Sequence, residues 1–383
     1  MSKPDRMPER PAPLVLVTTP AEGQPFGSHA AIAADGQRLL AADLSQRLGR
    51  LGAAVAPLPF VTPADGTPFH WGRSFVERAR HNLDAAPAPV DAIGYAGGGA
   101  LALLGDDALD ALLSPIPGEV VANNRFSADA FVVAGDLAKA LDALADCETD
   151  NAAPRHLNDA GFGWRDLGGT PWGRFDVDTT LDMALLRVAT RLEGTRLLDV
   201  AVTTYMEMAR LPGDRPLEVP QLEAVGAVMR DRTAELFVAG RVPASTWQEL
   251  ETETACRVRC LVEERGMRSA RAAGRPPRTI LATLMRRSSP AELVADLATL
   301  GDAVVLDTRV LMAAVAGSSD AATWPFEEER FASDFGDASR IATPWLRELT
   351  EAAAGASVPF LFGGHALVSD GLRLIVAAAW QGR

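Results

Sequence analysis

Short apolar runs alternate with helical patterns along the first half of the chain. Pro13–Thr19 is a continuous apolar run and predicts a buried strand. Ala30–Leu51 repeats Ala, Leu and Ile at helical spacing and is followed by Gly52, a residue that favours a helix C-terminus. The alternation then continues through predicted strands at Ala53–Val61, Asp91–Ala96 and twice within Val120–Gly135, and through predicted helices at Arg73–Leu83, Ala108–Leu113 and Asp136–Ala145. The stretch Phe175–Leu186 predicts a strand end, a turn and a long helix that continues to Leu198.

The second half repeats this alternation after a helical connector. Its predicted strands are Ala234–Gly240, Arg257–Val262, Ala303–Leu306 and Val358–Phe362. Strands that alternate with helices of this length predict βαβ units. We therefore expect an α/β fold with mostly parallel sheets and helices on both faces. The expected domains are an N-terminal α/β domain over residues 1–195, a helical connector over 196–232 and a second α/β domain over 233–383.

Composition narrows the kinds of partner. The chain has 383 residues, 48% of them hydrophobic, and a net charge of −13. This acidic balance argues against a nucleic-acid partner, because phosphate binding needs clustered Lys and Arg. No apolar run is long enough to span a membrane, and the N-terminal segment lacks the apolar core of a signal peptide. The three cysteines form no C-x-x-C pair, so we expect a cytoplasmic protein. Arginines and glycines at the predicted strand ends of the second half lead us to expect a small anionic ligand.

Two loops in the first half carry candidate ligand-binding residues. Gly97, Gly98 and Gly99 follow a predicted strand and precede a short helix. Their backbone amides either cradle an anion, or the glycines only permit a tight turn. Between two apolar runs, Asn123, Asn124 and Arg125 either bind a base, sugar or phosphate, or form an ordinary polar turn.

Polar residues follow all four predicted strands of the second half. In parallel strands these residues share the carboxyl edge of one sheet, where α/β proteins bind ligands. We predict His365 as the general acid or base, with Asp307 and Glu264 as further catalytic residues. The predicted anion-binding residues are Arg241, Arg265, Arg309, Gly363 and Gly364. The alternative is a buried ion network that holds the strand ends together.

One segment of the first half also resembles a known family. A strand, a loop with PLL-like residues at Gly99–Leu104, a short helix and a further strand precede Asp176-Val177-Asp178-Thr179-Thr180-Leu181-Asp182-Met183. This order resembles the nucleotidyltransferases that include molybdopterin guanylyltransferase and phospholactate guanylyltransferase, whose closing motif is D-x-D-T-P-x-D-L. The resemblance implies a nucleotidyltransferase-like N-terminal domain, a nucleotide ligand and Mg²⁺ held by Asp176 and Asp178.

The chain departs from that family at three places. Thr180 stands where the family's closing motif usually has Pro. The first loop of the chain, Thr18–Gly27, contains no Lys or Arg, although the family has a Gly-rich basic loop around the phosphates. Glycines also occupy the region of the family's central metal-binding aspartate. The D-x-D-T motif has a second interpretation, in which Asp178 or Thr179 caps the helix that begins near Leu181.

Three functions are therefore expected as alternatives. The first is a divergent nucleotidyltransferase-like enzyme that acts on a nucleotide or a phosphorylated metabolite, in which Mg²⁺ assists transfer of a nucleotidyl or related phosphoryl group. The second is a binding or scaffold protein that kept the fold without catalysis. The third is an enzyme whose chemistry lies in the C-terminal domain around His365.

Overall fold

The chain folds into two compact units. The computed structural model describes residues 11–20, 27–59, 69–167, 169–267 and 275–381. Unit 1 comprises Met1–Glu22 and Gln37–Asp176, and unit 2 comprises Gly23–Gly36 and Val177–Arg383. The chain thus divides at Asp176, whereas the sequence places the domain boundary at residue 195. Each unit contains its own sheet, so the predicted α/β class with two sheet-containing parts is confirmed.

Unit 1 is built on a mixed, mostly parallel sheet. Its six strands in the described ranges have the order β2-β1-β3-β5-β4-β6. They are β1 (Leu14–Thr19), β2 (Ala54–Pro59), β3 (Ala92–Ala96), β4 (Glu119–Ala122), β5 (Ala130–Ala134) and β6 (Gly163–Asp166). Strand β5 runs antiparallel to both β3 and β4, and the other pairs are parallel. A hairpin follows here because the loop between β4 and β5 is too short for the crossover of a dozen or more residues that parallel strands need.

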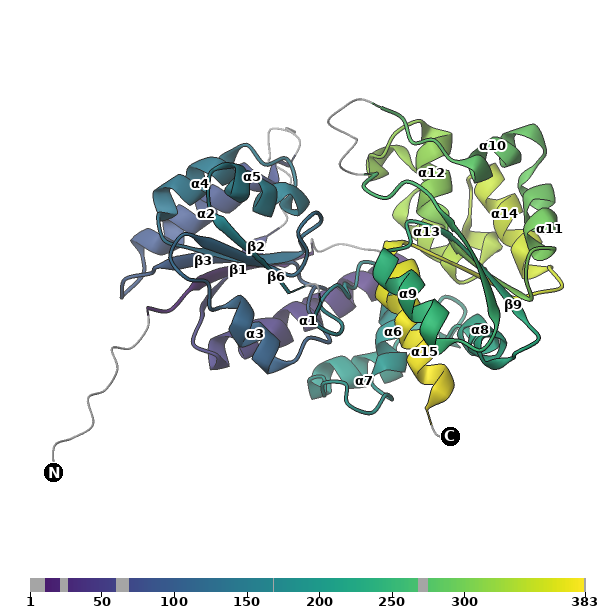
Figure 1. The fold of residues 1–383 in the computed structure, drawn as a ribbon, viewed down its shortest axis with the longest axis horizontal. Helices are drawn as coiled ribbons and strands as arrows, with labels where there is room; N and C mark the ends of the chain where they lie inside the picture. Colours follow the sequence, from purple (N-terminus) through teal and green to yellow (C-terminus); the bar gives the residue numbers. More distant parts are fainter. Residues whose placement is uncertain (1–10, 21–26, 60–68, 168, 268–274, 382–383) are drawn as a thin grey trace. The chain divides into compact units, whose positions relative to one another are not determined.

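Helices cover both faces of this sheet (Figure 1). They are α1 (His29–Arg50), of which the part from Gln37 onward belongs to unit 1, α2 (Trp71–Asp84), α3 (Asp106–Leu112), α4 (Leu137–Ala145) and α5 (Ala153–Asp159). Side chains alternate across a strand, so Leu14 and Leu16 pack with α2, α4 and α5, while Val15 and Val17 pack with α1 and α3. This two-sided burial explains why β1 is continuously apolar.

Unit 2 contains a sheet of four parallel strands in the order β10-β9-β11-β12. The strands are β9 (Glu235–Gly240), β10 (Arg257–Val262), β11 (Ala303–Asp307) and β12 (Phe360–Gly363), and a two-stranded ribbon of β7 (Arg210–Leu211) and β8 (Arg215–Pro216) precedes them. All four predicted strands of the second half are present within two residues of their predicted ends. Their parallel directions place the four carboxyl ends at one edge, as the alternation predicted.

Ten α-helices lie in the described part of unit 2: α6 (Thr180–Ala189), α7 (Val200–Met208), α8 (Pro220–Arg230), α9 (Ala244–Glu253), α10 (Ile280–Arg287), α11 (Pro290–Ala298), α12 (Thr308–Ala316), α13 (Glu327–Asp334), α14 (Pro344–Ala354) and α15 (Leu372–Trp380). Helices α10 to α14 share one core with the sheet side chains Phe237, Val304 and Phe362. Helix α15 packs against α6, α8 and α9 on the other face (Figure 1).

The predicted long helix after the D-x-D-T motif is shorter than expected. Helix α6 ends at Ala189, and Thr190 is its C-terminal cap residue. The prediction that it reaches Leu198 was wrong, because the Thr195 hydroxyl donates 2.8 Å hydrogen bonds to the carbonyls of Ala189 and Leu192 in a turn that closes the helix. None of the described helices is long and apolar enough to cross a membrane.

Candidate functional site

The strand order of unit 2 creates a topological switch point between β9 and β11. The chain leaves β9 into α9 on one face of the sheet and leaves β11 into α12 on the other. Two neighbouring strands whose connections diverge in this way leave a crevice outside their carboxyl ends, where open α/β sheets bind ligands. The residues that follow β9 and β11 are therefore the first to consider as a site.

An ion pair spans this switch point. Arg241, directly after β9, donates from Nε to Oδ2 of Asp307 at 2.6 Å and from Nη2 to Oδ1 at 3.0 Å. Asp307, the last residue of β11, is fully buried. Burial acts to raise the pKa of Asp307, but the charge and hydrogen bonds of Arg241, with smaller contributions from His365 and Arg309, hold that pKa below its usual value. The ion pair with Arg241 thus favours the ionised form of Asp307 and fixes the orientation of its carboxylate.

A second buried ion pair lies beside the first. Arg309, in the first turn of α12, donates to both carboxylate oxygens of Asp334 at 2.5 and 2.6 Å, and Asp334 ends α13. Nη1 of Arg309 also donates to the hydroxyl of Thr308 at 3.0 Å, and that hydroxyl donates to the carbonyl of Gly363 at 3.3 Å. These bonds connect the ends of β11 and β12 to α13.

His365 lies at the same edge, two residues after β12. It is partly buried, and its charge reaches Asp307 strongly enough to lower the pKa of that carboxyl. Ser369 donates from Oγ to the carbonyl of His365 at 2.8 Å, and the backbone of Ser369 is non-helical (φ −105°, ψ −113°) within a π-helical turn. Irregular turns of this kind occur often at functional sites.

Close packing explains the glycines before His365. A Cβ on Gly363 would lie 2.7 Å from side-chain carbons of both Leu181 and Leu367. Gly364 lies beside Arg309, with 3.6 Å between the position of such a Cβ and Nε of the arginine. These two residues thus let β12 and the following turn approach α6 and the Arg309–Asp334 pair closely.

Two predicted members of this cluster lie elsewhere. Glu264 follows the edge strand β10 and accepts a 2.7 Å hydrogen bond from the amide of Arg278, with a left-handed backbone (φ +56°). The preceding Glu263 likewise accepts from the amide of Ile280 at the start of α10. Arg265 is exposed in the same turn. Strand β9 lies between β10 and β11, so Glu264 is on the far side of β9 from Asp307. Its carboxylate instead holds the chain that leads into α10.

The glycine turn of unit 1 is a close-packed turn. The amide of Gly97 donates to the carbonyl of Asp129 at 2.8 Å, and that of Gly98 donates to Oγ1 of Thr18 at 3.1 Å. A Cβ on Gly98 would lie 2.6 Å from the carbonyl oxygen of Thr18. Gly99 completes the turn, after which Ala100 forms a β-bridge with Asp176. Because the amides of Gly97 and Gly98 are already bonded, the geometry favours a tight turn over an anion cradle.

The polar loop after β4 is also held by internal bonds. Oδ1 of Asn123 accepts from the amides of Asp129 and Ala130, and its Nδ2 donates to Asp129 and to the carbonyl of Gly173. These bonds satisfy the whole amide group of Asn123.

The next two residues of this loop also have local contacts. Asn124 accepts from the amide of Phe126 at 3.3 Å, and the guanidinium of Arg125 lies 5.4 Å from the ring centres of both Phe126 and Trp164. The polar-turn interpretation thus accounts for Asn123, Asn124 and Arg125. Residues 21–26 of the first loop lie outside the described part of the chain.

The D-x-D-T motif forms a helix cap. Oγ1 of Thr179 accepts from the amide of Asp182, and a carboxylate oxygen of Asp182 accepts from the amide of Thr179, which is the reciprocal pattern of a capping box. The predicted capping role of Thr179 is confirmed. Asp176 belongs to unit 1, and Asp178 is an exposed residue of unit 2. Within the described ranges, no group of three or more His, Cys, Asp or Glu side chains could hold a metal ion.

Asp182 connects this cap with the strand-end cluster of unit 2. It is buried, and burial first, then the negative charges of Asp178 and Asp334, raise its pKa to about 7. Its charge also acts on Arg309. Sequence reasoning missed Asp182 and Asp334 as members of the cluster, because both lie on helices and not after strands. The only sequence signal was the T-x-x-D capping pattern at Thr179.

Comparison with protein-family models and with curated protein sequences gave no match for this chain.

Proposed function

We propose that the carboxyl edge of the unit 2 sheet binds a small polar metabolite and that His365 transfers a proton to or from it. One observation carries this proposal: the Arg241–Asp307 ion pair spans the switch point, and His365 lies within electrostatic reach of the same carboxylate. A carboxylate that orients a histidine and stabilises its protonated form is a recurrent arrangement for general acid–base catalysis.

Each charged group has a distinct role in this proposal. Asp307 stays ionised and stabilises the imidazolium of His365. Arg241 orients Asp307 through Nε and Nη2, while its Nη1 has no hydrogen-bond partner among the described residues and is available to an anionic group of the ligand. The buried Arg309–Asp334 pair holds the ends of β11 and β12 in place. The arginines are thus mainly neutralised by aspartates, which favours a ligand with one anionic group over a polyphosphate.

Thermal unfolding of the full-length protein in the presence of small carboxylates and monophosphates tests the proposal. A ligand at about 100-fold its Kd adds roughly 2.7 kcal/mol of stability. We expect Arg241→Lys to weaken the response and His365→Gln to remove its dependence on pH between about 5 and 8. Arg80→Met, which removes an exposed ion pair in unit 1, is the matched control. A ligand response that both site variants retain unchanged would place the binding site elsewhere.

A second candidate function is nucleotide binding by unit 1. The observation that favours it is the β-bridge between Ala100 and Asp176, which joins the two segments on which the nucleotidyltransferase resemblance rests. Asp176 would then hold Mg²⁺ together with phosphate oxygens. We expect nucleoside triphosphates to raise the unfolding temperature only with Mg²⁺, and Asp176→Asn to abolish that rise. Equal results with and without Mg²⁺ would leave unit 1 as a scaffold.

A further inference from the structure

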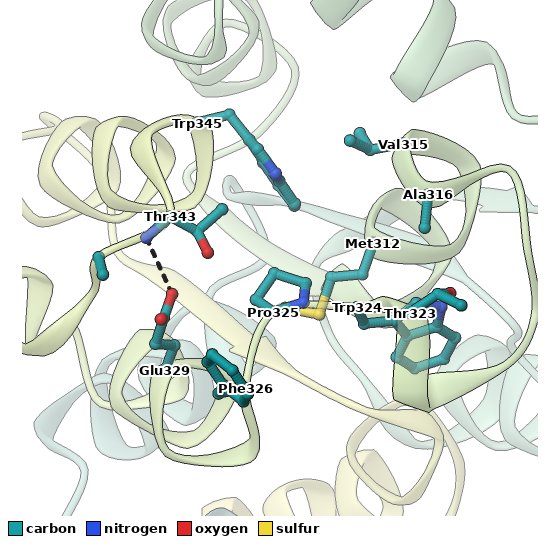
Figure 2. A pocket seen from close by; sticks show the side chains of 11 residues that line it. Met312, Val315, Ala316, Thr323, Trp324, Pro325, Phe326, Glu329, Thr343 and Trp345 are labelled. Atoms are coloured by element: carbon teal, nitrogen blue, oxygen red, sulfur yellow. Dashed lines mark hydrogen bonds between the residues drawn. The ribbon is translucent and has the colours of Figure 1, made fainter.

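An open aromatic groove lies in unit 2 among α12, α13 and α14 (Figure 2). It has a volume of about 460 Å³, within the range of small-molecule sites. Its walls contain the large side chains of Trp324, Phe326 and Trp345, together with Met312 and Glu329. Every lining residue belongs to unit 2, and none belongs to the strand-end cluster.

Two of the aromatic side chains, Trp324 and Phe326, lie in the short link before α13, and Trp345 lies in α14; Trp324 is only 8% exposed. Trp324 follows a short 3-10 turn (Ala321–Thr323), and its indole nitrogen donates to the carbonyl of Ser318 at 2.9 Å, which fixes the ring. Trp345 projects from the first turn of α14 toward Met312 and Pro325 in Figure 2. Phe326 directly precedes α13 and is 81% exposed. The ring of Phe326 is therefore accessible to a ligand at the edge of the groove.

A buried carboxylate completes the groove. Glu329 is only 8% exposed, and one of its oxygens accepts the amide hydrogen of Thr343 at 2.9 Å, as Figure 2 shows. This bond holds the Glu329 side chain of α13 against the start of α14, with its carboxyl group in the groove wall. The Arg330 guanidinium lies 5.9 Å from the Trp324 ring centre, so this ring already accepts a cation on one face.

We propose that this groove binds the quaternary or methylated ammonium group of a small organic cation. Aromatic rings attract such groups through their negative faces, and a nearby carboxylate adds charge complementarity. A methylated ammonium is also weakly hydrated, so it loses less on entering a half-apolar groove than a simple ammonium ion does. The proposal concerns a different site from the strand-end cluster and does not depend on its function.

Calorimetric titration with choline tests the proposal. The matched probe is its uncharged carbon isostere, in which a tert-butyl group replaces the trimethylammonium group. We expect choline to bind at least about tenfold more tightly than the isostere and to change the tryptophan fluorescence. Equal affinities for the two probes would show an apolar pocket without charge recognition. No binding of either probe at millimolar concentration would also overturn the proposal.

Two variants separate the contributions of the groove. Glu329→Gln keeps an oxygen acceptor for the amide of Thr343 but removes the charge, and we expect it to reduce the preference for choline about tenfold or more. Phe326→Ala removes an exposed ring without opening the core and should weaken choline binding severalfold. Phe126→Ala, at an exposed phenylalanine of unit 1, is the control and should bind choline as the wild type does. Unchanged choline binding in both groove variants would contradict the proposal. A wild-type dimer that Phe326→Ala dissociates would also contradict it, because the exposed ring would then serve an interface between two copies of the chain.

Discussion

Arg241 holds both carboxylate oxygens of Asp307, with 2.6 Å between Nε and Oδ2 and 3.0 Å between Nη2 and Oδ1. This pair joins the carboxyl ends of β9 and β11 through side chains, at the point where the chain connections diverge. Its two members differ in burial, since Asp307 is fully buried whereas the Arg241 side chain is 12% exposed. Loss of the arginine therefore leaves the more costly partner alone.

Removal of Arg241 should destabilise the protein strongly. Arg241→Met leaves the carboxylate of Asp307 buried without its hydrogen-bonded counter-charge, and we expect the free energy of unfolding to fall by about 3 kcal/mol. Urea unfolding checks this value. Arg80→Met breaks a pair whose side chains are 59% and 76% exposed and should change stability by no more than about 0.5 kcal/mol. Equal losses of unfolding free energy for the two substitutions would mean that the buried ion pair contributes no more to stability than an exposed one.

A methyl group at Gly240 should disrupt the same pair. The φ of Gly240 is +126°, and a Cβ there would lie 2.3 Å from Cβ of Asp307. We expect Gly240→Ala to cost at least about 3 kcal/mol, because both the backbone and the ion pair must shift. Gly317→Ala is the control, since φ there is +65° and no atom lies within 4 Å of the added carbon. It should cost only about 1 kcal/mol in the same unfolding assay.

Asp182 should make stability depend on pH. Its pKa is raised from 3.8 to about 7 in the folded protein, so the folded state holds a proton that the unfolded state releases above about pH 4. The free energy of unfolding should therefore fall as pH rises from about 4 to about 7 and level off above that. Denaturant unfolding at a series of pH values checks this slope. Asp182→Asn should flatten it, and an unchanged slope in that variant would assign the dependence to other groups.

The capping box at α6 should contribute measurably to stability. Thr179→Ala removes the side-chain acceptor for the amide of Asp182 and should lower the free energy of unfolding by about 1 kcal/mol. Thr179→Ser keeps the hydroxyl and should recover most of that loss in thermal or urea unfolding. If serine were no better than alanine, the methyl group of Thr179 and not its hydroxyl would be the stabilising part.

Local patterns were sufficient to predict most strands. The strand-like pattern of Arg257–Val262 and the apolar run of Val358–Phe362 predicted β10 and β12 to within two residues, because short segments of this kind bounded by turn residues leave few alternatives. Strand β6 was missed, since Gly163–Asp166 has no apolar run and lies at the edge of its sheet. The short loop between the two apolar runs of Val120–Gly135 is a sequence pattern typical of the β4–β5 hairpin.

The candidate site could be predicted only in part. Arg241, Asp307 and His365 lie at the ends of parallel strands or within two residues of them, so the sequence placed them at one sheet edge. Glu264 meets the same description but lies after β10, which only the strand order puts at the far side of β9. Asp334 pairs with Arg309 because α13 docks against the end of β12, and no spacing in the sequence encodes that contact.

The sequence by itself determined the α/β class, the alternation of elements and the residues at the strand ends, because periodicity and turn chemistry act over a few neighbouring positions. The tertiary structure alone decided which strands are neighbours and which charges are paired. Those outcomes depend on how deeply distant segments bury each side chain. Two aspartates four residues apart differ for this reason: Asp178 is exposed to solvent, whereas Asp182 is buried and its pKa is raised to about 7.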